Sequence, residues 1–77
     1  MDRQNLVHMA NQIGVFFEAM PDREEALLGI ADHLHKFWEP RMRQALLDYM
    51  DAEKETELRP IVVLAIRAHR SQMLTRH

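Results

Sequence analysis

The spacing of apolar residues, interrupted by three prolines, restricts the fold of this chain more than any other feature. Apolar residues recur every three or four positions along most of the sequence, which gives an α-helix one apolar face. Pro21, Pro40 and Pro60 divide this pattern, because a proline disfavours helix in the residue before it but is tolerated in a first helical turn. The sequence therefore predicts four helices, over residues 4–20, 23–38, 40–52 and 60–74.

Each predicted helix has one apolar stripe that can face a common core. Asp2 and Asp22 precede the first two helices and are suited to cap them, because a carboxylate can accept hydrogen bonds from the free N–H groups of a first turn. The expected core stripes, in chain order, are Leu6, Met9, Ala10, Ile13, Phe16, Phe17 and Met20; Leu27, Ile30, Ala31, Leu34, Phe37 and Trp38; Met42, Ala45, Leu46, Tyr49 and Met50; and Ile61, Leu64, Ala65 and Ala68.

Length and composition favour one small helical domain over residues 1–77. The hydrophobic fraction of 47% and the charged fraction of 29% are typical of globular proteins. Glycine, proline and β-branched residues are few, which favours helix over strand. The chain has no cysteine, so a domain of this marginal size must rely on helix packing or on a partner rather than on disulfides. We expect an all-α bundle of about four helices.

Charge and hydropathy bear on the compartment and on the class of partner. No apolar run approaches the roughly 20 residues of a membrane span, and the first residues lack the pattern of a signal peptide, so we expect a cytoplasmic protein. The net charge of −2 gives no general attraction to nucleic acid. Arg41 and Arg43 open the third helix after a short break, as in some DNA-binding domains, but Asp48 and Asp51 follow them. We expect neither a membrane nor a nucleic-acid partner.

Charged residues are segregated in the second half of the chain. Acidic residues dominate positions 48–57, whereas only basic charged residues follow Glu57. The two segments can attract each other within the fold, and the basic one can alternatively form a docking surface on the last helix.

No set of residues predicts catalysis, cofactor binding or a metal site. His33 and His35 are two residues apart, so a helix directs them differently, and Asp32 with His35 supplies only two ligands. Ser71 is the only serine and lies near a chain end. Gly14 and Gly29 stand alone within helices, unlike the glycines of a phosphate-binding loop. We therefore assign no catalytic, cofactor-binding or metal-ligating residue.

Two helices carry a second stripe outside their expected core faces. Gly14 belongs to the stripe on the first helix, where a glycine disfavours helix by about 1 kcal/mol relative to alanine, so close approach of another backbone is one reason for it. Rows of aliphatic residues on so small a chain suggest an interface, unless the last helix is central and buried on both sides. The stripes are Val7, Asn11, Gly14 and Glu18 on the first helix, and Val62, Ile66, His69 and Met73 on the last.

The bend between the second and third helices is the most distinctive segment. It places Phe37 and Trp38 before the Pro40 break and Arg41 and Arg43 after it. Tryptophan and arginine are enriched in binding hot spots, so Trp38, Arg41 and Arg43 are candidate partner contacts. Phe37 is expected in the core. The full set of candidate partner-binding residues is Trp38, Arg41, Arg43, Val7, Asn11, Gly14, Val62, Ile66 and Met73.

Four segments resemble a known family. They are Asn5-Leu6-Val7, Met9-Ala10-Asn11-Gln12-Ile13, Ala31-Asp32-His33-Leu34 and Phe37-Trp38-Glu39-Pro40-Arg41-Met42-Arg43. Together they resemble the delta subunit of NAD-dependent, molybdenum-containing formate dehydrogenase, over about residues 5–47 and more weakly over 60–65. Arg59 departs from the smaller or acidic residue expected before Pro60.

The resemblance implies a small accessory subunit of an enzyme complex that oxidises formate and reduces NAD. In that family the catalytic alpha subunit carries a molybdenum cofactor and iron–sulfur clusters, and the beta and gamma subunits carry FMN and further clusters. We thus expect a non-catalytic chain that holds no cofactor itself, binds the alpha subunit and possibly beta and gamma, and supports assembly or stability of the active complex. A self-associating helical regulator, or a small DNA-binding dimer, remains the alternative.

Overall fold

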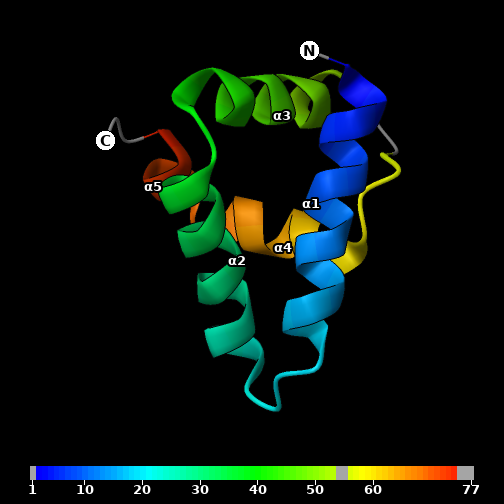
Figure 1. The fold of residues 1–77 in the computed structure, drawn as a ribbon. Coiled ribbons are helices and arrows are strands. Elements are labelled where there is room, and N and C mark those ends of the chain that lie inside the picture. The colour runs from blue at the N-terminus through cyan, green and yellow to red at the C-terminus, as the bar shows by residue number, and fades with distance from the viewer. Residues whose placement is uncertain (1, 54–55, 75–77) are drawn as a thin grey trace.

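Five helices make up the computed structural model, which describes residues 2–53 and 56–74 (Figure 1). They are α1 (Arg3–Glu18), α2 (Arg23–Phe37), α3 (Pro40–Ala52), α4 (Pro60–Ala68) and α5 (Arg70–Leu74). The described residues contain no strand, so the all-α prediction is confirmed. The predicted helix over 60–74 is in fact two helices, because His69 leaves the helical conformation at φ −125° and ψ 35°.

The capping predictions for the first two helices are confirmed. Asp2 accepts a hydrogen bond from the backbone N–H of Gln4, at 3.2 Å. Asp22 accepts two, from the N–H groups of Glu24 and Glu25, at 3.0 and 3.3 Å. Pro40 and Pro60 each open a helix, where the missing N–H leaves no hydrogen bond unmade. Local sequence therefore fixes where these helices begin.

The helices are arranged around α4. In Figure 1, α1 and α2 run in opposite directions as a pair, α3 crosses one end of that pair, and α4 passes across its middle. Helix α4 contacts both α1 and α2, and α5 packs on α2 and α3. This arrangement gives the short helix α4 neighbours on two sides.

The burial pattern of α4 corrects the exposed stripe expected on the last helix, and it agrees only in part with the alternative of a helix buried on both sides. Val62 and Ile66 are fully buried, and Met73 of α5 is buried as well. Ile61 and Ala65 complete one continuous buried face. The core stripe expected here was therefore partly wrong, since it included two residues that are exposed, Leu64 and Ala68.

The second stripe of α1 is also an internal contact rather than a free surface. Val7 and Gly14 are buried, and a Cβ added at Gly14 would lie 2.6 Å from Cγ2 of Val62. The glycine thus lets α4 approach α1 closely, so the expected reason for Gly14 holds in part. The approaching group is a side chain of this same chain.

Asn11 fixes the segment that leads into α4. Its Oδ1 accepts a hydrogen bond from the N–H of Arg59 at 2.8 Å, and its Nδ2 donates to the carbonyl of Glu57 at 3.0 Å. The Arg59 guanidinium reaches Glu18, also on α1, at 2.7 Å. Arg59 gives α4 no side-chain cap, because a guanidinium has only donors and cannot accept from the first-turn N–H groups. Two side chains of α1, Asn11 and Glu18, therefore hold the start of α4.

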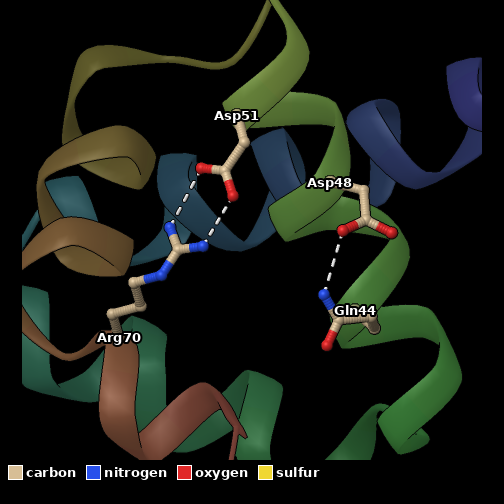
Figure 2. Close-up of polar contacts among 4 residues, drawn as sticks. All are labelled: Gln44, Asp48, Asp51 and Arg70. Carbon is tan, nitrogen blue, oxygen red and sulfur yellow. Dashed lines mark hydrogen bonds and ion pairs between the residues drawn. The ribbon is translucent and has the colours of Figure 1, made fainter.

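Segregated charge joins α5 to α3. Arg70 donates to both carboxylate oxygens of Asp51, at 3.1 and 2.6 Å, and Gln44 bonds Asp48 one turn away (Figure 2). The hydrogen bonds from Arg70 lower the pKa of Asp51, and the same bonds raise the pKa of Arg70. For this pair, the expected attraction between the acidic and basic segments is confirmed.

Candidate protein-binding surface

Two phenylalanines project from the α1–α2 pair into solvent. Phe16 and Phe37 are each 72% exposed, although both were expected in the core. The expectation for Phe37 is wrong because α2 ends there and Trp38 adopts an extended conformation, φ −96° and ψ 138°. Trp38 turns inward and is only 5% exposed. The extended backbone at the end of α2 thus places Trp38 inside the fold and Phe37 in solvent.

A row of rings connects these two phenylalanines across the helix pair. Phe16 meets Phe17 edge-to-face with centroids 5.1 Å apart, Phe17 lies 6.4 Å from His33, and His33 lies 4.7 Å from Phe37. Such edge-to-face and tilted geometries are the favourable ones for aromatic pairs. The row therefore runs from α1 to α2 as one continuous surface.

Gly29 allows this row to lie close to α2. A Cβ added at Gly29 would be 2.4 Å from Cε1 of Phe17 and 2.8 Å from its Cδ1. The Phe17 ring therefore rests directly on the α2 backbone. Since nothing larger than hydrogen fits between them, Gly29 sets how deeply Phe17 packs between the two helices.

Beside the row lies a hollow that we call the aromatic groove. It has a volume of about 410 Å³ and is mostly apolar. Trp38 and Ile13 contribute to its lining, and Gln12 and His33 are its only polar side chains. The complete lining is Met9, Gln12, Ile13, Phe16, Phe17, His33 and Trp38.

The lining of the aromatic groove contains no Asp, Glu, Lys or Arg, although the exposed Glu39 and Arg41 follow Trp38 in the sequence. Residues 4–17, which make up most of α1, include no Asp, Glu, Lys or Arg. On α2, Lys36 pairs with Asp32 at 3.0 Å. The charged residues at the two ends of α1 also have partners: Glu18 pairs with Arg59, and Arg3 lies 3.5 Å from Glu53. The surface is thus apolar and nearly neutral, like the centre of a protein interface.

The structure separates the partner contacts expected from sequence into two groups. Most of them make contacts within the chain, because α4 packs against both α1 and α2. These are Val7, Gly14, Val62, Ile66 and Met73, which are buried in the core, and Asn11, which bonds residues 57 and 59. Expecting these as a free surface was wrong.

The three residues at the bend have three different environments. Trp38 is buried but lines the aromatic groove. Arg41 is exposed at the start of α3. Arg43 is only 1% exposed, and its Nε and Nη1 have no hydrogen-bond partner. Arg41 therefore remains available to a partner. The expectation that Arg43 is an exposed contact is wrong, because its side chain is buried.

Sequence reasoning missed the surface formed by Phe16, Phe17 and His33: it expected both phenylalanines in the core, and it gave His33 no role in partner binding. Helical spacing places both phenylalanines on the apolar side of α1, and that side is wider than α2 alone can cover. The absence of charge over residues 4–17 was a usable signal, because a helix with only one buried face normally has charged residues on the other.

Neither a metal site nor a membrane span is found among the described residues. Within residues 2–53 and 56–74, no three His, Cys, Asp or Glu side chains are grouped to hold a metal ion. In the same ranges, no helix has the length and hydropathy needed to cross a bilayer.

Comparison with known proteins places the chain in a family. Residues 5–66 match the family model described as NADH-dependent formate dehydrogenase delta subunit FdsD. The chain belongs to this family. The match confirms the resemblance found in the sequence and includes all of the residues that line the aromatic groove. As a delta subunit, the chain is one component of a multi-subunit enzyme. No curated protein and no solved structure matches it.

Proposed function

We propose that this chain is a non-catalytic accessory subunit that binds the catalytic alpha subunit of an NAD-dependent formate dehydrogenase in the cytoplasm. The molybdenum cofactor, iron–sulfur clusters and FMN are then carried by the alpha, beta and gamma subunits. The family match over residues 5–66 carries this proposal. The exposed aromatic row on α1 and α2 supports it, because a surface of this kind is suited to contact with another protein.

The proposed mechanism is stabilisation by mass action. A chain that binds only the folded or cofactor-loaded alpha subunit shifts the equilibrium toward that state. At a free concentration 100 times the Kd, the shift is about 2.7 kcal/mol. That is a large part of the 5–15 kcal/mol that typically separates folded from unfolded protein. Binding alone can therefore support assembly of the active enzyme.

Contacts near the bend fit this role. Arg41 is exposed at the start of α3, and Trp38 lies beneath the aromatic groove. We assign Arg41 a direct contact with the alpha subunit and Trp38 a supporting role. Because Trp38 is buried and lines the groove, its loss acts through the shape of the surface.

The test is a pull-down of the tagged chain from its own host grown on formate, followed by mass spectrometry and a molybdenum assay. We expect a large molybdenum- and iron-containing dehydrogenase at fixed stoichiometry, with less recovered for Arg41→Ala. Leu64→Ala is the matched control, because Leu64 is exposed on α4 outside the groove. Recovery of the chain alone as an oligomer would favour self-association, and recovery of nucleic acid would favour a regulator; either contradicts the proposal.

A further inference from the structure

We infer that the aromatic groove receives an uncharged apolar helix of the alpha subunit, with at least one bulky side chain entering between α1 and α2. This inference rests on the proposed function and specifies the contact surface and the chemistry of its occupant.

Two large apolar rings are exposed on the α1–α2 pair. Phe16 and Phe37 lie at opposite ends of the ring row, and both are largely in water. Val15 and Leu28 are also about half exposed on these two helices, but neither lines the groove. Burying a side chain of phenylalanine size is favourable, so two such rings can supply a substantial part of an interface. Exposed rings on two adjacent helices favour a partner that spans both.

Charge defines the chemistry of the occupant. The α1 side of the groove has no charged residue over positions 4–17, and the nearby Lys36 is paired with Asp32. A charged segment placed on the groove lining would lose its hydration without gaining an ion pair there, which is unfavourable; Arg41 is exposed but does not belong to this lining. An apolar segment has no charged group whose hydration would be lost on binding. Complementarity therefore selects a partner whose contacting face is uncharged.

Shape indicates a helix with a protruding side chain. The groove lies between two antiparallel helices and has a volume of about 410 Å³. A helix that enters such a groove uses large apolar residues three and four positions apart as anchors. Gln12 and His33 are the polar side chains available to such an anchor, and either can pair with a polar tip such as an indole N–H. A leucine, phenylalanine or tryptophan anchor fits this lining.

The first experiment maps the contact by photo-crosslinking within the assembled enzyme. The crosslinker p-benzoylphenylalanine replaces Phe16, Phe37 or, as the matched control, Leu64. We expect positions 16 and 37 to crosslink to one uncharged helical segment of the alpha subunit, and position 64 not to do so. Crosslinks from 16 or 37 to a second copy of this chain, or to a charged segment, would overturn the inference.

The second experiment measures affinity for enzyme prepared without this subunit. Phe16→Gln and Phe37→Gln should each raise the Kd about 10- to 100-fold, as expected for hot-spot residues, while Leu64→Gln leaves it unchanged. Helix content and Tm verify folding, which both variants should retain because each ring is mostly in solvent. If the wild-type chain binds and the two phenylalanine variants bind equally well, the groove is not the contact. If the wild-type chain does not bind at all, the proposed function itself fails.

Discussion

Replacing Gly14 by alanine tests the packing of α1 on α4, because helix propensity and packing predict opposite results. On propensity alone, Gly→Ala within a helix stabilises by about 1 kcal/mol. In this fold, however, the new Cβ would be 2.6 Å from Cγ2 of Val62 and 3.4 Å from Cγ2 of Ile61. Favourable carbon–carbon contacts lie at about 3.5–4.0 Å, so the two helices must separate by nearly 1 Å at this point.

Val62 cannot easily move away from the added methyl group. It is fully buried, and a β-branched side chain in a helix has one strongly preferred rotamer. Overpacking of this kind costs about 1–3 kcal/mol. Subtracting the propensity gain, we expect Gly14→Ala to lower the free energy of unfolding by up to about 2 kcal/mol. At about 4–8 °C per kcal/mol for a domain of this size, Tm should fall by as much as about 16 °C.

The assay is thermal and urea unfolding of Gly14→Ala, Val62→Ala and the double variant. Val62→Ala leaves room for the methyl group at position 14, so the double variant should be clearly more stable than the sum of the two single effects indicates. A Gly14→Ala variant that is more stable than wild type would show that α4 does not approach α1 at this residue, and would refute the reasoning.

Three further predictions concern single side chains. Asn11→Ala should lower the free energy of unfolding by about 1–2 kcal/mol, since two hydrogen bonds to residues 57 and 59 are lost; equal chemical-denaturation midpoints for Asn11→Ala and Gln12→Ala would contradict this. Arg43→Met should raise Tm, because a buried guanidinium with unpartnered Nε and Nη1 is replaced by an apolar chain of similar length; a fall in Tm by calorimetry would show that Arg43 is satisfied in solution. The Asp51–Arg70 pair should make stability acid-dependent: because the pKa of Asp51 is lowered from 3.8 on folding, its contribution is present above about pH 4 and is lost as pH falls through the folded-state pKa. Wild type and Arg70→Gln should therefore differ in Tm at pH 7 and converge near pH 2, and a constant difference across that range would rule out this linkage.

The helices and their starting points could be predicted because local chemistry decides them. Asp2 and Asp22 cap the first turns, and Pro40 and Pro60 open helices as expected. The apolar side of α1 could likewise be predicted, because its apolar residues recur every three or four positions. What periodicity does not reveal is how many neighbours a helix has. An apolar face of Ile61, Val62, Ala65 and Ile66 is equally compatible with one deep contact or with two.

The candidate site could be predicted only in part, for reasons that operate at single residues. Which of Phe37 and Trp38 turns inward depends on the backbone conformation at one position after α2, which the sequence pattern leaves open. Arginine is rarely fully buried, so nothing in the sequence indicated that Arg43 lies in the interior. The family resemblance could be found from the sequence because it depends on the residue types in short runs, such as positions 37–43, rather than on how those residues pack.

The accessory-subunit proposal predicts binding that can be measured directly with purified components. Formate dehydrogenase prepared without this subunit is titrated with the wild-type chain, and both the Kd and the molybdenum retained on heating are measured. The account predicts saturable binding at fixed stoichiometry, together with slower loss of molybdenum and activity in the bound enzyme. Failure of the chain to bind, with molybdenum loss unchanged at saturating concentrations, would contradict it.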